Sequence, residues 1–327
     1  MIRLARRITG IISGIFSFLY LIFFLNAVQT ASLVLYPFSR RAFRAVNRWC
    51  ARSIWGLWVV MAEIQNGIDV RFTGDAPRPR QNALVLPNHQ SMADVLALMC
   101  LAWRCRRIGD MKWFVKDVVK WFPGFGWGMK FLDCLFVKRD WTRDRPGIER
   151  LFAKFRAEQI PMFLVSFLEG TRRTPKKHLA AQAFAKARGL RCPEHVLVPK
   201  TKGFVATMTG LRDHLDAVYD VTIGYAPVVP TLVACFSLHV RRIDVHVRVF
   251  PAASLPQDPG ALDAWVRQRF EEKDALLEAF ARDGRFPGPS FSGRVRAREW
   301  FASEHRLSAS DVSSPSEALR VEPDLRR

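Results

Sequence analysis

The stretch Ala83-Leu84-Val85-Leu86-Pro87-Asn88-His89-Gln90-Ser91-Met92-Ala93-Asp94 decides how the middle of this 327-residue chain folds. Its first five residues form a short apolar run bounded by polar residues, a pattern that predicts a buried strand. Ser91 is a favourable N-cap, and the apolar residues after it recur at helical spacing, so a helix is expected to begin there. A strand that leads directly into a helix indicates an α/β fold. It also places His89 at the carboxyl end of the strand, where open α/β sheets bind ligands.

His89 and Asp94 are candidates for a catalytic pair. On one uninterrupted helix, residues five apart point about 140° away from each other, so the two side chains could not meet. With His89 in the turn and Asp94 in the first helical turn, the carboxylate reaches back to the imidazole, holds one tautomer and stabilises the imidazolium. Such a pair suits a general base acting on a substrate hydroxyl. The alternative is that Asp94 only caps the helix with Ser91 and that His89 is an ordinary polar residue at a strand end.

A second motif follows another apolar run, residues 162–167, which also predicts a buried strand. This run leads into Glu169-Gly170-Thr171-Arg172. Gly170 permits a tight turn, and Arg172 offers a planar fork of donors that suits phosphate. A base at one strand end and a phosphate-binding turn at another favour one functional site over two unrelated local motifs.

Together with two further blocks, these motifs resemble the glycerophospholipid acyltransferases, in particular the lysophosphatidic acid acyltransferases. The four blocks occur in the family's order at residues 88–94, 136–139, 167–172 and 198–200, and the resemblance covers roughly residues 80 to 280. Residues 176–204 are more similar to the branch that contains the lysocardiolipin acyltransferases and their bacterial relatives. Leu168 stands where the family usually has proline, and Asp133 where many members have glycine.

The resemblance implies a mixed β-sheet flanked by helices, the glycerolipid acyltransferase fold. It implies transfer of a fatty acyl group from an acyl thioester, acyl-CoA or acyl-carrier protein, to the free hydroxyl of a lysophospholipid. Lysophosphatidic acid is the favoured acceptor, with phosphatidic acid as product. His89 would take the hydroxyl proton and Asp94 would orient His89. No bound cofactor and no metal are expected.

The resemblance also implies a set of substrate-binding residues around these two strand ends and after a third predicted strand, residues 132–137. Arg139 and Arg172, with Lys138, would hold the acceptor phosphate, and Glu169 would organise Arg172 and its turn. The full expected set is Asn88, Ser91, Lys138, Arg139, Glu169, Gly170, Thr171 and Arg172.

The composition of the chain indicates which classes of molecule it can bind. Fifty Lys and Arg against thirty Asp and Glu leave a formal charge of +20, which favours anionic partners. Nucleic acid is disfavoured, because no nucleic-acid motif is present and the basic residues are scattered along the chain. The six cysteines show neither metal-ligand spacing nor a paired framework, which indicates free thiols in a reducing compartment.

The N-terminal residues are expected to associate with a membrane. Residues 8–39 carry no charge, and about 20 apolar residues are enough to cross a bilayer. The segment either spans or lies in one leaflet. Residues 40–65 mix arginines with tryptophans, which is typical of a membrane interface, although a core helix with extended arginines is the alternative. We expect a bacterial inner-membrane protein whose catalytic domain faces the cytoplasm.

Three regions are expected: a membrane-associated helical segment at 1–65, a catalytic domain at 66–283, and a polar, disordered tail at 284–327. Residues 196–199 are predicted to form a strand. Residues 242–250 are predicted to form an edge strand with Asp244, His246 and Arg248 facing outward. Two functional alternatives remain: reacylation of lysophosphatidylglycerol or lysocardiolipin, and a non-catalytic basic membrane-binding module. The sequence leaves the oligomeric state open.

Overall fold

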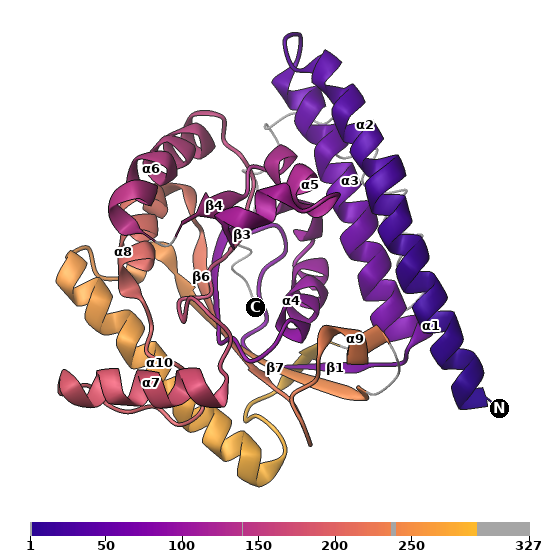
Figure 1. Ribbon diagram of the computed structural model, residues 1–327. Helices are drawn as coiled ribbons and strands as arrows, with labels where there is room; N and C mark the ends of the chain where they lie inside the picture. Colours follow the sequence, from indigo (N-terminus) through magenta and orange to yellow (C-terminus); the bar gives the residue numbers. More distant parts are fainter. Residues whose placement is uncertain (1, 139, 237–239, 293–327) are drawn as a thin grey trace, which may run out of the picture. The chain divides into compact units, whose positions relative to one another are not determined.

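A computed structural model describes residues 2–138, 140–236 and 240–292 (Figure 1). Its described residues form an eight-stranded sheet in the order β4-β3-β5-β2-β6-β7-β1-β8. The strands are β1 (Asp69–Gly74), β2 (Ala83–Pro87), β3 (Met111–Lys116), β4 (Leu135–Val137), β5 (Phe163–Val165), β6 (Ala217–Gly224), β7 (Arg242–Pro251) and β8 (Ser290–Ser292).

The sheet is mixed, which confirms the predicted fold class. Strands β4, β3, β5, β2 and β6 run parallel to one another. β7 is antiparallel to β6 and parallel to β1, and β8 is antiparallel to β1. β2 pairs directly with β5, from Ala83 opposite Phe163 to Val85 opposite Val165. The segments that follow these two strands therefore leave the sheet side by side.

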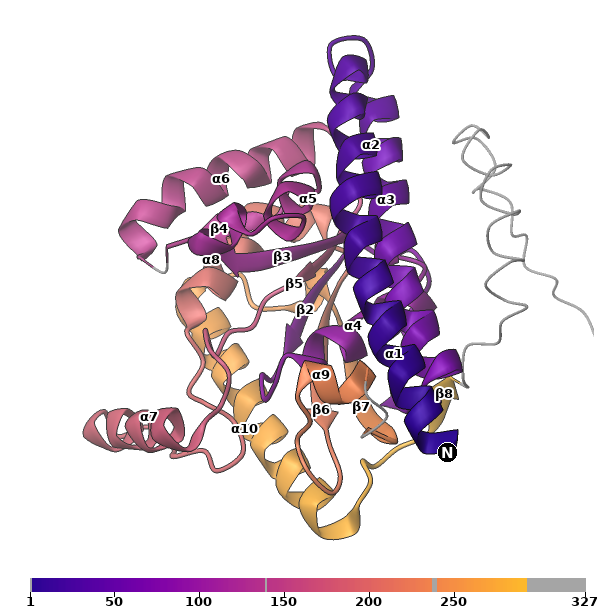
Figure 2. The same cartoon turned by 45° about the vertical axis from the view of Figure 1, so that its right-hand side comes forward.

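Helices cover both faces of the sheet (Figures 1 and 2). On one face, Leu84 and Leu86 of β2 share a buried core with Phe152, Phe204 and Phe270. These three aromatic residues come from α6 (Trp141–Ala157), α8 (Thr201–Leu211) and α10 (Pro259–Asp283). On the other face lie α4 (Ala93–Arg104) and, outside it, α3 (Arg40–Val60). The remaining α-helices are α1 (Ile2–Leu19), α2 (Asn26–Ala31), α5 (Phe125–Phe131), α7 (Pro175–Ala187) and α9 (Leu232–Phe236). The short helical turns are η1 (Tyr20–Leu25), η2 (Ser32–Leu35), η3 (Met61–Gln65), η4 (Ile108–Asp110), η5 (Asp117–Trp121), η6 (Arg212–His214) and η7 (Ala252–Ser254).

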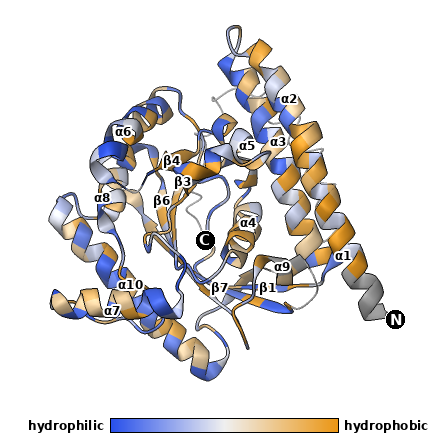
Figure 3. Ribbon diagram, viewed as in Figure 1, coloured by the Kyte–Doolittle hydropathy of each residue, from blue (hydrophilic) through white to orange (hydrophobic). Residues whose placement is uncertain are grey.

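The N-terminal residues form one long helical arm, from α1 to η2, and α3 runs back beside it (Figures 1 and 2). Residues Ile8–Leu35 are long and apolar enough to cross a membrane, and most of their apolar stretch is not buried within the protein. Figure 3 shows apolar residues along most of this arm. α3 and η3 pack on the sheet domain, because Trp55 stacks on Trp113 at 5.8 Å and Arg104 donates two hydrogen bonds of 2.8 Å to Glu63. The arm in turn contacts α3, where the hydroxyls of Tyr20 and Ser53 lie 2.9 Å apart.

The prediction that residues 242–250 form an edge strand is wrong. β7 lies between β6 and β1, and Asp244 and His246 are buried. The strand tolerates charge in the interior because its charged side chains are paired: Arg242 donates to Asp244 at 2.6 Å, and Arg248 donates to Asp220 at 3.1 Å. The alternation of polar residues therefore marks a buried ion-pair network and not a solvent-exposed face.

Residues 196–199 do not form the predicted strand. Two carboxylates accept hydrogen bonds from the backbone N–H groups that would otherwise donate to a neighbouring strand. The N–H of Val196 donates to Asp274 at 3.3 Å, and that of Leu197 donates to Glu169 at 3.0 Å.

The C-terminal boundary also differs from the prediction. Residues 284–292 contribute β8 to the sheet, and Phe286 is buried. Residues 293–327, the rest of the predicted tail, lie outside the described residues.

Candidate active site

The carboxyl ends of β2 and β5 bring the two sequence motifs together. His89 follows β2 by two residues, and Glu169 follows β5 by four. Glu169 Oε1 accepts a hydrogen bond from the backbone N–H of His89 at 2.6 Å, while its Oε2 accepts from Leu197. Glu169 thus joins the histidine turn to the 196–199 loop, two contacts that the sequence did not predict.

His89 and Asp94 form a buried hydrogen-bonded pair. Asp94 is the second residue of α4, and its Oδ2 lies 2.8 Å from His89 Nδ1. The same oxygen accepts from the N–H groups of Gln90 at 2.7 Å and Ser91 at 2.9 Å, so Asp94 also caps the turn. Because a carboxylate is an acceptor, the proton of a neutral His89 sits on Nδ1. Nε2 is then the nitrogen that can remove a proton from a bound hydroxyl.

A third residue, which was not predicted from the sequence, is hydrogen-bonded to Asp94 of this pair. Tyr225 follows β6, and its hydroxyl donates to Asp94 Oδ1 at 2.6 Å. Burial and the negative charge of Asp94 raise the pKa of Tyr225 far above its ordinary value, so the phenol stays a donor. The signal in the sequence is weak: a tyrosine one residue beyond a buried strand. Only the pairing of β6 with β2 places it beside the dyad.

Glu169 lies in a dry environment, with 3% of its surface exposed. Burial raises the pKa of its carboxyl to about 8, although the hydrogen bonds from the His89 and Leu197 amides act in the opposite direction. The two amides bind different oxygens, so the carboxyl works as a clamp between two loops.

Asn88 and Ser91, which are predicted to contact substrate, both form hydrogen bonds within the fold. Asn88 is fully buried, and its amide exchanges two hydrogen bonds with the backbone of Ile223, at 2.7 and 3.0 Å. Ser91 Oγ donates to the carbonyl of Pro230 at 2.6 Å and accepts from Ala93 N–H at 2.8 Å. The helix begins at Ala93, two residues after the predicted N-cap, with Met92 in the cap position.

Basic side chains gather around the turn after β5. Gly170 has φ +67°, a left-handed conformation that favours glycine, and a Cβ there would lie 3.3 Å from the side chain of Lys200. Lys177 donates to the hydroxyl of Thr171, and Arg172 is exposed to solvent. Lys200 belongs to the fourth sequence block, and the structure places it over the second motif.

Lys138 lies at the end of β4, two strands from β5 in the sheet, and its side chain is exposed. Its backbone N–H donates to Asp144 at 2.8 Å. Arg139, the other basic residue of that block, lies outside the described residues.

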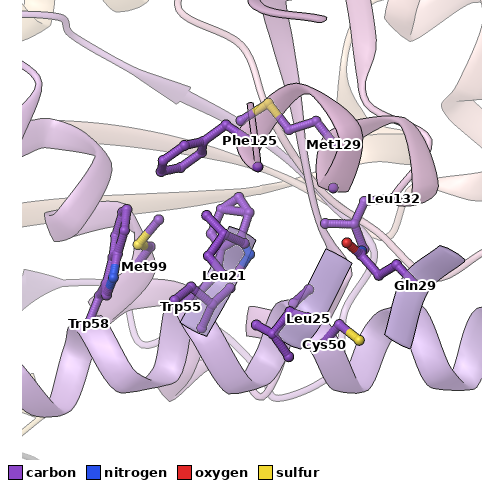
Figure 4. A pocket seen from close by; sticks show the side chains of 14 residues that line it. Leu21, Leu25, Gln29, Cys50, Trp55, Trp58, Met99, Phe125, Met129 and Leu132 are labelled. Atoms are coloured by element: carbon purple, nitrogen blue, oxygen red, sulfur yellow. The ribbon is translucent and has the colours of Figure 1, made fainter. Parts of the chain in front are cut away.

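An apolar pocket lies between the helical arm and the sheet domain (Figure 4). Its lining comes from the arm, from α3 and α4, and from the region around α5, with Gln29 as the polar exception. Stacked aromatic rings connect it to the dyad. Phe167 stacks on His89 at 3.9 Å, Trp113 lies 6.4 Å from Phe167, and Trp55, which lines the pocket, stacks on Trp113.

Comparisons with known proteins agree with this geometry. The family model described as acyltransferase matches residues 69–232, and a second model, described as acyltransferase C-terminus, matches residues 234–303. The chain is 32% identical over 267 residues to the 1-acyl-sn-glycerol-3-phosphate acyltransferase delta of Rattus norvegicus, covering 80% of this chain and 71% of the relative. It is also 32% identical over 270 residues to the 1-acyl-sn-glycerol-3-phosphate acyltransferase 2 of Arabidopsis thaliana, covering 80% and 69%.

Among solved structures, the chain is similar to the 1-acyl-sn-glycerophosphate (LPA) acyltransferase PlsC of Thermotoga maritima. The TM-score is 0.51 with 16% identity, over 84% of this chain and 98% of that one. This likeness concerns the fold. The family models and the relatives, taken with the paired strand ends, establish that this chain belongs to the acyltransferase family of enzymes.

Proposed function

We propose that this protein acylates the free hydroxyl of 1-acylglycerol 3-phosphate and so forms phosphatidic acid. The observation that carries the proposal is the buried His89–Asp94 pair at a strand end, beside a turn rich in basic side chains. The names of the relatives in Rattus norvegicus and Arabidopsis thaliana favour this acceptor.

In the proposed reaction, His89 Nε2 removes the proton of the acceptor hydroxyl. The oxygen attacks the thioester carbonyl carbon, and the resulting tetrahedral intermediate breaks its C–S bond. The imidazolium then returns the proton to the leaving thiolate. Asp94 stabilises the imidazolium between these two transfers. The proposal needs no resident cofactor or metal, because the thioester, on CoA or on a carrier protein, brings its own leaving group.

The acceptor phosphate is assigned to the basic turn. Arg172 is exposed and suits bidentate binding of phosphate oxygens. Lys200 lies against Gly170 and adds a second positive charge at the same turn. Lys138 and Arg139 are also assigned to the acceptor phosphate, because both belong to the sequence block at residues 136–139.

The apolar pocket is assigned to an acyl chain. Fatty acyl chains need an apolar site, and the stacked rings from His89 to Trp55 link the proposed reacting atoms to the lining of this pocket. The pocket borders the helical arm, which is itself apolar and mostly exposed (Figures 3 and 4).

We further propose that the protein resides in the bacterial inner membrane with its sheet domain on the cytoplasmic side. The apolar arm and the lipid-acyltransferase relatives favour association with a membrane. Six free cysteines, of which all except Cys192 are buried, are compatible with a reducing compartment.

A direct assay tests this function. Purified full-length enzyme is given labelled acyl-CoA and, in separate reactions, 1-acylglycerol 3-phosphate, lysophosphatidylglycerol, lysocardiolipin or lysophosphatidylcholine. We expect the highest kcat/KM with 1-acylglycerol 3-phosphate. A clear preference for lysocardiolipin or lysophosphatidylglycerol would replace the proposed acceptor. Turnover with none of them, in protein that is folded, would remove the catalytic proposal.

A further inference from the structure

One short segment, residues 117–131, presents four large apolar side chains to solvent. We call it the aromatic platform; it comprises η5, the turn after it and α5. Trp121 is 75% exposed and Phe122 63%, and Val118 and Trp127 lie beside them at 56% and 42%. Such clusters are rare on water-facing protein surfaces and mark places where an apolar partner binds.

Lysines are interleaved with these rings. Lys130 Nζ lies 5.8 Å from the ring centre of Trp121 and 5.6 Å from that of Trp127. Lys120 Nζ lies 5.4 Å from the Trp121 ring and pairs with Asp117 at 2.8 Å. Exposed tryptophan with lysine beside it is the chemistry of the lipid headgroup region, where the ring is partly dehydrated and the ammonium binds phosphate.

The aromatic platform is continuous with the apolar arm. Trp127 Nε1 donates to Thr30 Oγ1 at 3.0 Å, and the rings of Phe125 and Phe18 lie 6.4 Å apart. Gly124 packs so closely on Ile22 that a Cβ there would lie 2.8 Å from the isoleucine side chain. Figures 1 and 2 both show α5 beside the arm. Phe18 is itself 41% exposed, so apolar surface passes from the arm onto the platform.

We propose that the aromatic platform is a second lipid-binding surface, which docks on an anionic bilayer together with the exposed side of the arm. Trp121 and Phe122 enter the interface, and Lys130, with the exposed Lys116, binds lipid phosphates. A lipid surface is favoured over a protein partner because the rings adjoin a helix apolar and long enough to lie in or across a membrane.

The platform also forms a wall of the apolar pocket, because Gly124, Phe125 and Gly128 line that pocket (Figure 4). If the proposed function holds, docking of the platform therefore places this wall at the level of the lipids, and an acyl chain enters the pocket without crossing water. The lipid-binding proposal itself does not depend on turnover.

The test attaches an environment-sensitive nitrobenzoxadiazole label to Val118→Cys in full-length protein. Cys192→Ser removes the one exposed cysteine among the described residues. The protein is reconstituted in vesicles of phosphatidylcholine and phosphatidylglycerol. We expect a blue-shifted emission and quenching by lipids brominated near the headgroup. Phe122→Cys provides a second labelling position if the first variant is poorly folded.

Leu179→Cys, labelled in the same way, is the matched control. Leu179 is 66% exposed on α7, so it is equally apolar and accessible, but it lies on a different helix. Its label is expected to emit as in water, without quenching. Lys116→Gln/Lys130→Gln should reduce the quenching at position 118 in anionic vesicles. Emission at 118 and 122 as water-like as at 179 would overturn the proposal, whether or not the enzyme is active.

Discussion

The hydroxyl of Tyr225 donates a 2.6 Å hydrogen bond to Asp94 Oδ1, while the other oxygen of Asp94 faces His89. The turn after β2, the end of β6 and the start of α4 therefore meet at one carboxylate. The phenol both fixes the rotation of Asp94 and withdraws negative charge from the oxygen that faces the imidazole. In the proposed mechanism it is a positioning residue, since it contacts Asp94 and acts through it.

Tyr225→Phe removes this donor and keeps the ring in place. We expect kcat to fall roughly ten- to a hundredfold with KM unchanged, because a hydrogen bond to a charged group contributes about 1.5–3 kcal/mol. The acid limb of the pH–rate profile should move to higher pH, since an Asp94 with one donor fewer holds the imidazolium more strongly. Steady-state kinetics over a range of pH values measure both effects.

Tyr219→Phe is the control for this change. Tyr219 is also buried and lies in β6, the strand that Tyr225 follows, and its hydroxyl donates to Gln81 at 2.8 Å, away from the dyad. It should lower stability without moving the pH profile. An unchanged profile in Tyr225→Phe, with the same small loss of activity in both variants, would reduce Tyr225 to a packing residue.

The positions of His89 and Asp94 could be predicted because they depend on local structure. A strand, a turn and a helix start within twelve residues, and the spacing leaves one arrangement in which the two side chains meet. The prediction that β2 and the strand before Glu169 share a site also needed only the rule that parallel strands bind ligands at their carboxyl ends.

The rest depended on contacts between distant residues. Tyr225 and Asp94 are hydrogen-bonded although they lie 131 residues apart in the sequence. Glu169 accepts from the backbone N–H of Leu197, 28 residues further along, in a loop predicted to be a strand. The alternating charges of residues 242–250 predict an edge strand, but Asp220 on β6 and Glu272 on α10 pair with Arg248 of β7 inside the fold. A single sequence does not show which distant carboxylate satisfies a buried amide or guanidinium.

Glu169→Gln tests the clamp between the two loops. Glutamine offers only one acceptor oxygen, so one of the amides of His89 and Leu197 loses its partner, at about 1–3 kcal/mol. Because the folded pKa of Glu169 is about 8, above its ordinary value of 4.5, the folded state holds a proton that the unfolded state releases. The stability contributed by Glu169 therefore falls as pH rises from about 4.5 to about 8.

Thermal unfolding of both proteins in detergent, from acidic to alkaline pH, checks this sign. The wild-type protein should be more stable than Glu169→Gln at low pH, and the difference should narrow toward pH 8. A difference that widens with pH would mean that the ionised carboxylate is the form that the amides stabilise.

Arg172→Ala tests the assignment of the acceptor phosphate. Loss of one charge-assisted contact of about 1.5–3 kcal/mol should lower kcat/KM for 1-acylglycerol 3-phosphate roughly ten- to a hundredfold, mainly through KM. Lys200→Ala should act in the same direction, because its side chain lies over Gly170 at the same turn. Arg188→Ala, on the exposed end of α7, is the control. An effect confined to the KM of the acyl donor would show that Arg172 binds the donor and not the acceptor phosphate.

A double-mutant cycle on His89 and Asp94 tests the proposed chemistry. His89→Ala should lower the rate about 10²–10⁴-fold, the usual contribution of a general base, while folding and membrane binding persist. Asp94→Asn keeps the shape of the side chain but removes the charge opposite Nδ1, so it should also be severe. Since Asp94 acts through His89, the double variant should be little slower than His89→Ala alone.

Asp94 also caps the turn through Gln90 and Ser91, so the unfolding temperature of each variant must be measured alongside its activity. Losses that multiply in a folded double variant would show that the two residues act independently. Near-normal turnover by His89→Ala would assign the reaction to another base.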